Sequence, residues 1–338
     1  MEKLTIKDIA KLAGVSPSSV SIVINGKKGV SDKTRAKVLG IIEKMQYTPN
    51  PSSRRLVLNK TNNIAVLFNK DTHPLNHLFH SELNSIIVSE RESRGYNLVF
   101  TSAAINNDIV QLPNVIRSHD VDGVIFYGDP DPLIENALKQ HELPYISVDS
   151  HLTSEDKLSV RADYETAAYV AVKYLVELGH TKIAFIGNHA LQYHYAQTFS
   201  GFTKVLDEQD IKIPVNWLQF RAYNEEAATM CMDEILHGSL KPTAVFCSAD
   251  IYAIGAMKSI KKHNLKIPQD ISIIGIDDIL LCQYVSPTLT TIKIDKHKMG
   301  KVAVDLIIDR IENHNTESRV LVASTLVVRE STSALSNS

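Results

Sequence analysis

The chain is poor in cysteine and has no long hydrophobic run, and both shortages narrow the class of protein. Its 338 residues include only three cysteines, which lie far apart at Cys231, Cys247 and Cys282. This spacing does not fit a disulfide framework or a cysteine-based metal site, and it is typical of a reducing cytoplasm. No stretch of about 18 apolar residues is present, so no transmembrane helix is expected. The first residues, MEKLTIKDIAKLAG, lack the apolar segment of a signal peptide.

Signatures of catalysis are also missing. The sequence contains no G-x-S-x-G, no P-loop and no metal-ligand spacing with an open position. The junction after the first predicted strand, NKDTHP at 69–74, has no glycine and does not fit a dinucleotide-binding loop. We therefore interpret the chain as a protein that is not an enzyme and needs no cofactor.

The charge is distributed unevenly along the chain. Residues 1–60 hold 12 Lys and Arg against 4 Asp and Glu, a net charge of +8, although the whole chain carries −2. The remaining residues therefore carry −10. A basic segment on an acidic body is typical of binding to a phosphate backbone, and a solvated surface is the alternative.

The stretch TIKDIAKLAGVSPSSVSIVIN, which begins at Thr5, is predicted to form two short helices joined by a tight turn. Thr5 and Ser16 are residue types that cap helices, and Asp8 follows Thr5 at capping-box spacing. Gly14 fits a left-handed residue that ends a helix, and Pro17 fits the first position of the next one. The pattern indicates a helix-turn-helix, whose second helix enters the DNA major groove; a small packing unit without a ligand is the alternative.

A third helix and a basic linker follow. The helix is expected to be capped by Ser31 and to continue to Gln46, which closes a small three-helix core. Residues 47–60, YTPNPSSRRLVLNK, are rich in Pro, Ser and Arg, which favours a flexible linker. The alternative is a short basic helix over 52–58, because Asn-Pro is also a helix-start signal. Such a helix can insert an apolar side chain into a base step of the minor groove.

From residue 63 onward, short apolar strands alternate with helices in two sets, near 63–150 and 160–278. Strands without alternation of apolar and polar residues are buried on both faces, which is typical of parallel sheets covered by helices. We therefore predict an α/β fold in which two doubly wound parallel-sheet subdomains follow an all-α headpiece. A helix over 299–312 and a strand over 320–328 are expected to cross back between the subdomains. Other predicted elements include helices over 109–118 and 198–209 and a strand over 217–221.

The carboxyl ends of the predicted strands, where parallel sheets bind ligands, carry polar and aromatic side chains. They are Asn69, Asp71, Thr101, Tyr127, Asp129, Asp149, Asn188, Tyr223, Asp250, Asp277 and Asp278. This chemistry suits a polyhydroxylated or otherwise polar small molecule, although Asp and Asn at strand ends are also common turn formers.

Five histidines lie near the same ends, at His73, His77, His80, His189 and His194. They raise the alternative of a metal-responsive switch, because histidines one helical turn apart can share a metal. No Cys and no tight acidic triad accompanies them, so no metal site is predicted.

Several segments, taken in order, together resemble the LacI/GalR family of bacterial transcription regulators. They are TIKDIAKLAGVSPSSVSIVIN, VSDKTRAKV, YTPNPSSRRL, LVELGHTKIAFIG (175–187), SGF (200–202), KPTAVFCSAD (241–250) and IPQDISIIGIDDILLCQYVSPTLTTI (267–292). The resemblance spans essentially the whole chain.

The resemblance implies a cytoplasmic homodimer that binds pseudo-palindromic double-stranded operator DNA and has no contact with a membrane. Its parts would be a helix-turn-helix headpiece over 1–48, a hinge helix over 49–60 and an effector-binding core over 61–338 that is similar to periplasmic sugar-binding proteins. The subdomain boundaries follow from the same resemblance: an N-subdomain over 61–162 and 292–320, and a C-subdomain over 163–291 and 321–338.

The resemblance also assigns DNA contacts. The base-reading positions are Pro17, Ser18 and Ile22, with Leu56 as the intercalating residue. The phosphate-binding positions are Thr5, Ser16, Ser19, Ser21, Asn25, Ser31, Thr34 and Tyr47. Of the three base-reading residues only Ser18 can form a hydrogen bond, so DNA shape and thymine methyl groups are expected to supply much of the specificity.

For the small molecule, the resemblance points to a defined set of positions in the core. They are His73, Phe79, Tyr127, Asp149, Thr198, Tyr223, Asp250 and Asp277. Thr198 stands where relatives usually carry an Arg that binds sugar hydroxyls, and Ala249 stands in place of a common Asn. The cleft is therefore expected to have been re-tuned.

Together these observations predict a DNA-binding transcriptional repressor whose operator affinity is controlled by a small polar effector, with a sugar or sugar derivative as the first expectation. The alternative is a solute-binding protein for sugar uptake. Whether the effector releases DNA or promotes its binding is left open by the sequence.

Overall fold

The computed structural model describes residues 4–24, 26–47, 60–70, 77–92, 94–151, 158–314 and 319–335. Contacts divide the chain into two compact units, Met1–Asn62 with Asp120–Asp122, and Asn63–His119 with Gly123–Ser338. The three helices of the first unit are called the headpiece below, and the second unit is called the core. Helices of the described part are all too short or too polar to cross a membrane.

The headpiece consists of α1 (Ile6–Ala13), α2 (Pro17–Ile24) and α3 (Asp32–Lys44). The predicted caps are present: the Thr5 N–H donates to Asp8 Oδ2 at 2.8 Å, and the Ser19 N–H donates to Ser16 Oγ at 3.1 Å. Gly14 ends α1 with a left-handed φ of 64°. Ile9, Ala13, Val20 and Val38 are buried between the helices. The predicted helix-turn-helix and its closing third helix are therefore confirmed.

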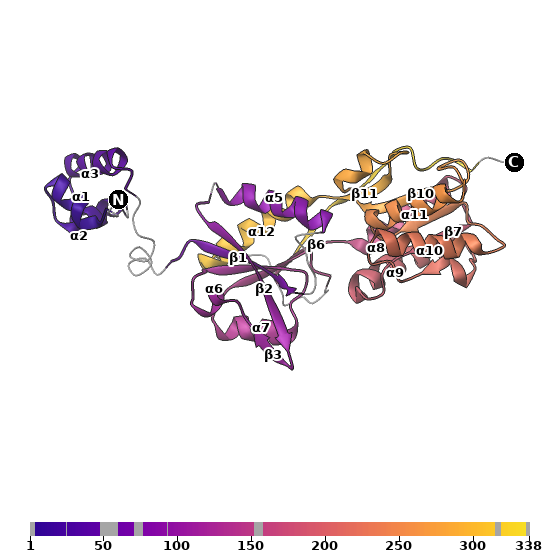
Figure 1. Ribbon diagram of the computed structural model, residues 1–338, viewed down its shortest axis with the longest axis horizontal. Helices are drawn as coiled ribbons and strands as arrows, with labels where there is room; N and C mark the ends of the chain where they lie inside the picture. The colour runs from indigo at the N-terminus through magenta and orange to yellow at the C-terminus, as the bar shows by residue number, and fades with distance from the viewer. Residues whose placement is uncertain are drawn as a thin grey trace. The chain divides into compact units, whose positions relative to one another are not determined.

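The first lobe of the core is built on a seven-stranded sheet in the order β12-β6-β5-β4-β1-β2-β3. Its strands are β1 (Asn63–Asn69), β2 (Asn97–Asn106), β3 (Ile109–Gln111), β4 (Gly123–Tyr127), β5 (Tyr145–Val148), β6 (Ser159–Ala162) and β12 (Arg319–Val322). Its helices are α5 (Leu78–Glu92), α6 (Asn114–Arg117), α7 (Pro132–Gln140) and α12 (Lys296–Ile311). In Figure 1, α5 and α12 lie on one side of this sheet and α6 and α7 on the other. All strand pairs except β2–β3 are parallel.

The second lobe is built on a six-stranded sheet in the order β13-β11-β10-β9-β7-β8. Its strands are β7 (Ile183–Ile186), β8 (Leu218–Gln219), β9 (Ala244–Cys247), β10 (Ser272–Asp277), β11 (Thr290–Ile294) and β13 (Ser324–Val327). Its helices are α8 (Tyr164–Glu177), α9 (Gln192–Glu208), α10 (Glu225–His237) and α11 (Asp250–Lys262). Only β13 runs antiparallel to its neighbour. The predicted α/β class with mostly parallel sheets is therefore confirmed.

Helices of the second lobe pack in two pairs, α8 with α9 and α10 with α11. A glycine permits each close approach. A Cβ added to Gly201 of α9 would lie 2.2 Å from the Glu165 carbonyl oxygen, and one added to Gly255 of α11 would lie 2.2 Å from the Glu225 carbonyl oxygen. Gly201, in the SGF segment singled out in the sequence, is therefore required for the packing of α9 against α8.

The chain passes between the lobes three times among the described residues: after β6, after β11 and between β12 and β13. The predicted strand over 320–328 is therefore two strands, and a single residue, Ala323, separates them. β12 pairs with β6 of the first lobe, whereas β13 pairs with β11 of the second. A single hydrophobic core runs through both lobes.

The helix predicted over 109–118 is wrong. β3 pairs antiparallel with β2, and only the short α6 follows it. The reason is the two-residue turn between the strands: Asn107 and Asp108 have φ values of 49° and 61°. Two consecutive left-handed residues are typical of a tight hairpin, a conformation that Asn and Asp tolerate.

Two other predicted boundaries move. α9 begins at Gln192 rather than at 198, which places His194 on the helix. The strand predicted over 217–221 is only Leu218–Gln219, and it is preceded by a 3-10 helix, η2 (Val215–Trp217), that starts after Pro214. A second 3-10 helix, η3 (Leu280–Gln283), follows β10.

Candidate functional site

The predicted base-reading residues differ in exposure on α2. Pro17 and Ser18 are exposed, whereas Ile22 is half-buried. Val20 and Val23, on the opposite face, are buried in the headpiece core. α2 therefore presents its N-terminal end to solvent, which is the end that contacts base edges in helix-turn-helix proteins. Leu56, the fourth predicted residue, lies outside the described residues.

The hydroxyl groups predicted to bind phosphates lie at helix starts, except that of Ser21, which lies farther along α2. Thr5, Ser16 and Ser31 are exposed, and Ser19, Ser21 and Thr34 are half-buried. Pairs of these hydroxyls are within hydrogen-bond distance: Ser16 and Ser19 at 2.9 Å, and Ser31 and Thr34 at 2.9 Å. Helix N-termini attract anions, so the same residues that cap α2 and α3 lie where a phosphate is favoured.

The two other predicted phosphate-binding residues are Tyr47 and Asn25. Tyr47 is only 8% exposed and packs in the headpiece core, so its ring stabilises the three helices. Asn25 lies outside the described residues. The loop between α2 and α3 is fixed by Arg35, whose guanidinium donates to the Lys27 carbonyl oxygen at 2.5 Å.

In the core, one buried carboxylate collects polar side chains from both lobes. Asp149 follows β5 and has a left-handed φ of 57°. Its Oδ2 lies 2.9 Å from Nε2 of His80, on α5 of the first lobe. Its Oδ1 accepts the hydroxyl of Tyr164, at the start of α8 in the second lobe, at 2.9 Å. Asp149 therefore joins the two lobes.

The environment keeps Asp149 ionised. Burial opposes ionisation, but the hydrogen bond from His80, the charges of His151 and His80, and the hydrogen bond from Tyr164 outweigh it. Together they hold the pKa of Asp149 well below its usual range. A carboxylate that accepts hydrogen bonds from two side chains is stabilised in its charged form.

Two more histidines complete this group, which we call the Asp149 cluster: His80, Asp149, His151, Tyr164 and His194. The His194 ring centroid, from α9, lies 4.6 Å from that of Tyr164 and 5.4 Å from that of His151. Burial, followed by the nearby charge of His151, lowers the pKa of His194 to about 3, so its imidazole is neutral. Nδ1 of His80, His151 and His194 is buried and has no hydrogen-bond partner among the described residues.

The predicted effector residues Tyr127 and Phe79 lie beside this cluster. The Tyr127 ring is 5.0 Å from His80, and its hydroxyl donates to Asn84 Oδ1 at 2.6 Å. Phe79 is 1% exposed and lies 5.6 Å from the His80 ring. Phe79 and Tyr127 both pack in the hydrophobic core.

Asp250 occupies a different environment at the start of α11. Its Oδ1 accepts the Thr291 hydroxyl at 2.6 Å, and its Oδ2 accepts the Ile279 N–H at 3.1 Å. Cys282 Sγ lies 3.0 Å from the same Oδ2. Burial raises the pKa of Asp250 to about 7 against these hydrogen bonds. Asp250 thus ties α11 to the segment that follows β10.

Asp277 ends β10 with an unusual φ of 120°, and its carbonyl oxygen accepts from Lys296 Nζ at 2.9 Å. Burial and the charge of Asp250 raise the pKa of Asp277 well above its usual value. Lys296 also pairs with Glu82 of α5 at 2.8 Å, and Glu82 Oε1 accepts the Leu280 N–H at 2.9 Å. These contacts form a second polar junction between the lobes.

The remaining predicted effector residues do not join the Asp149 cluster. Thr198 is fully buried, and its hydroxyl donates to the carbonyl oxygens of His194 and Tyr195 on its own helix, at 2.9 and 3.2 Å. Tyr223 is 73% exposed. His73 lies outside the described residues.

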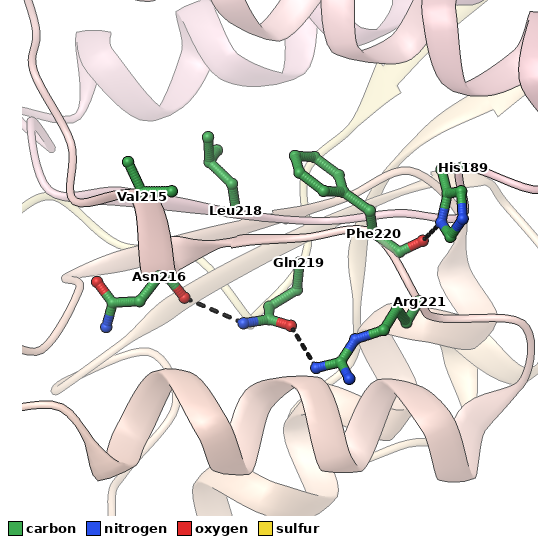
Figure 2. Close-up of a pocket in the computed structure, with 7 residues that line it drawn as sticks. All are labelled: His189, Val215, Asn216, Leu218, Gln219, Phe220 and Arg221. Atoms are coloured by element: carbon green, nitrogen blue, oxygen red, sulfur yellow. Dashed lines mark hydrogen bonds between the residues drawn. The ribbon is translucent and has the colours of Figure 1, made fainter.

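A separate pocket of about 470 Å³ lies along the edge strand β8 and is shown in Figure 2. Its lining comprises His189, Val215, Asn216, Leu218, Gln219, Phe220 and Arg221. His189 Nδ1 lies 2.7 Å from the Phe220 carbonyl oxygen, which can only accept, so this nitrogen carries the proton. No predicted effector residue with a described position lines this pocket.

Sequence reasoning did not assign His80, His151, Tyr164 or His194 to the effector site. His80 and His194 were considered only as part of a possible metal-responsive switch. Within the described residues, no group of three His, Cys, Asp or Glu side chains is placed to hold a metal ion. Tyr164 begins α8 just after the mostly buried strand β6, a position where ligands of parallel sheets bind.

Known proteins resemble this chain over nearly its full length. Residues 5–50 match the model of the bacterial regulatory proteins of the lacI family, and residues 172–332 match a periplasmic binding protein-like domain. A ribose operon repressor from Haemophilus influenzae is 33% identical over 97% of this chain and 98% of its own length. The HTH-type transcriptional repressor PurR from Vibrio vulnificus is 33% identical over 96% of this chain and 98% of its own.

Among solved structures, the lac repressor dimer bound to operator and the anti-inducer ONPF has a TM-score of 0.84 and 25% identity. The match covers 98% of this chain and 100% of that one. The order of the elements, the two matched domains and the full-length relatives agree, and the chain belongs to the lacI family of bacterial regulatory proteins.

Proposed function

We propose that the protein is a transcriptional repressor that binds pseudo-palindromic operator DNA as a homodimer and is controlled by a small polar effector bound in the core. The observation that carries the proposal is that one chain contains both a recognition helix with an exposed N-terminal end and a two-lobed core with a buried polar cluster. The named repressors among its relatives support it.

The headpiece would bind DNA mainly through charge. Its net charge of +8 over residues 1–60 predicts strong attraction to phosphates and a steep loss of affinity with salt. Pro17, Ser18 and Ile22 would face the bases, and only Ser18 would form hydrogen bonds. Leu56 would enter the central base step of the minor groove.

The effector would bind around Asp149, because ligands of parallel sheets bind beyond the carboxyl ends of the strands and this cluster lies there. The relative named as a ribose operon repressor favours a sugar or sugar derivative. Asp149 and Glu82 each bond across the lobes, so a ligand that alters either junction would alter the angle between them. The equilibrium between two such angles can be shifted both by DNA and by the effector.

Dimerisation is supported by the lac repressor dimer and by exposed apolar side chains after β10. Leu280 is 58% exposed and Tyr284 75%. We propose a cytoplasmic location and no catalytic role, since DNA is the partner that the headpiece fits. A solute-binding role would leave the basic headpiece without a purpose.

The proposal is tested by selecting binding sites for the full chain from random duplex DNA. Enrichment of one pseudo-palindromic site, bound in a gel shift with strong salt dependence, is expected. Ser18→Ala and Leu56→Ala should weaken binding to that site more than binding to random DNA. Failure to enrich any two-fold symmetric site would overturn the proposal.

A further inference from the structure

The two ring nitrogens of His80 differ, because one has a hydrogen-bond partner and the other has none among the described residues. Its Nε2 lies 2.9 Å from Asp149 Oδ2, and its Nδ1 is buried without a hydrogen-bond partner among the described residues. The ring also contacts Tyr127 and His77, at centroid distances of 5.0 and 4.9 Å. A buried polar atom without a partner costs about 1–3 kcal/mol, so its retention indicates a partner that arrives from outside.

The proton on His80 can be placed from its neighbour. Asp149 is ionised, because the hydrogen bonds and charges around it lower its pKa despite burial. An ionised carboxylate only accepts hydrogen bonds, so Nε2 of His80 must carry the proton. When the His80 imidazole is neutral, its other nitrogen has a lone pair, and Nδ1 of His80 is then an acceptor.

Two further unpartnered nitrogens lie around the same carboxylate. Nδ1 of His151 and Nδ1 of His194 are also buried and have no partner in the described part of the chain. His194 is 8% exposed and its imidazole is neutral. Three such atoms, grouped around Asp149 and Tyr164, outline a binding position rather than a packing defect.

The charges facing this position are unfavourable for an anion. Asp149 is negative, whereas Asp277, toward the second junction, has a raised pKa and adds no such charge, and Glu82 is paired with Lys296. Lys296, a cation of that junction, is already bonded to Glu82 and to the carbonyl oxygens of Asp277 and Asp278. Thr198 offers no charge, and its hydroxyl is bonded within its own helix.

We propose that His80 is a specificity-determining residue of the effector site, where its Nδ1 accepts a hydrogen bond from an O–H or N–H of an effector that carries no negative charge. The inference rests on the proposed function and deepens it, because it separates neutral polyols from their phosphorylated or carboxylated counterparts. The Asp149–Tyr164 hydrogen bond connects the contact at His80 to the second lobe.

The tautomer is tested first, by ¹⁵N NMR of the histidine rings in the full-length protein without effector, with His80→Phe used to assign the signals. The expected result is a proton on Nε2 and none on Nδ1 of His80 at neutral pH. A proton on Nδ1 would overturn the inference whatever ligand the protein binds.

Ligand class is tested with D-ribose and D-ribose 5-phosphate, a pair that differs by one anionic group, in thermal shift and calorimetric titration. Stabilisation by ribose and none by its phosphate supports the inference. Stabilisation by the phosphate alone overturns it.

Two variants of His80 then test its two ring nitrogens separately. His80→Gln keeps an amide near the Nε2 position and loses the Nδ1 acceptor, so ribose should bind about tenfold more weakly, the cost of one hydrogen bond. His80→Asn keeps a polar group near Nδ1 and should lose less. Equal ribose affinity for His80→Gln and wild type would overturn the role of His80. Operator selection without ligand tests the proposed function independently of all these results.

Discussion

Asp149 and Asp250 are both buried aspartates at the carboxyl ends of parallel strands, yet their surroundings shift their pKa values in opposite directions. The pKa of Asp149 is lowered, because a histidine and a tyrosine donate to its carboxylate and a second histidine adds charge. The pKa of Asp250 is raised, because burial outweighs a threonine, a cysteine and a backbone N–H. Burial acts on both, so the neighbouring side chains decide the charge.

The difference also separates a ligand position from a structural one. The partners of Asp250 lie in its own lobe and consume both of its oxygens. The partners of Asp149 come from two lobes, and one of them, His80, keeps a second nitrogen free of any described partner. An aspartate at a strand end is therefore informative about function only together with what its partners leave unsatisfied.

The largest expected effect is that of Asp250→Ala on stability. The variant leaves the Ile279 N–H and the Thr291 hydroxyl buried without an acceptor, so the free energy of unfolding should fall by about 3 kcal/mol. Urea denaturation measures the change. Asp207→Ala, at an exposed position on α9, is the control and should change stability by less than about 0.5 kcal/mol. A loss below about 1 kcal/mol for Asp250→Ala would contradict its structural role.

The pH dependence of stability should differ in sign between the two aspartates. A raised pKa means that the folded state of Asp250 binds a proton more tightly than the unfolded chain, so its contribution is lost as pH rises from about 4 to about 7. Asp250→Asn should remove this decline. Denaturant unfolding of wild type and variant at pH 4 to 8 gives the difference.

For Asp149 the lowered pKa gives the opposite sign. Its charged form stabilises the folded state above about pH 4, and that contribution is lost as pH falls below this value. Asp149→Asn should therefore flatten the acid limb and leave the decline between pH 4 and 7 in place. If both Asn variants changed the same limb, the contrast between the sites would be wrong.

A smaller effect on stability is expected when a hydroxyl donor is removed from charged Asp149 or from Asp250, which takes up a proton. Tyr164→Phe removes the hydroxyl that donates to Asp149, and Thr291→Val removes the one that donates to Asp250. A hydrogen bond to a charged group is stronger, so losses of about 2 and about 1 kcal/mol are expected. Chemical denaturation at pH 6 compares them, and a larger loss for Thr291→Val would reverse the assignment.

The smallest effect is expected for Cys282→Ser. The serine hydroxyl is a better donor to Asp250 than the thiol but is smaller in a fully buried position, so the two changes oppose each other. The free energy of unfolding should change by less than about 1 kcal/mol. Cys247→Ser, also fully buried, is the matched control and should lose more, because no hydrogen bond to Asp250 offsets its burial.

Local signals were sufficient for the headpiece and for most of the core elements. Thr5, Gly14 and Ser16 specify helix ends through short-range hydrogen bonds and a single backbone conformation, and the structure contains each of them. The hairpin at Asn107-Asp108 differs from the predicted helix, because the apolar residues after the turn fit a helical period as well as a strand.

The effector site was only partly accessible from the sequence. Tyr127 ends a buried strand and Asp149 follows one, which is a readable signal. His80 and His194 lie on helices far apart in the sequence, so nothing local indicates that they surround one carboxylate. The assignments of Thr198 and Tyr223 stay predictions that the present geometry does not draw into the cluster.

The sequence by itself determined the order of the elements, the basic headpiece and the α/β class, because capping, hydrophobic period and charge act over a few residues at a time. Only the tertiary structure decided which aspartate is charged, which histidine nitrogen is left as an acceptor, and which contacts join the lobes. Those properties depend on burial and on partners more than 60 residues away, such as His80 for Asp149. Electrostatic free energies inside a protein are set by such neighbours and by the exclusion of water.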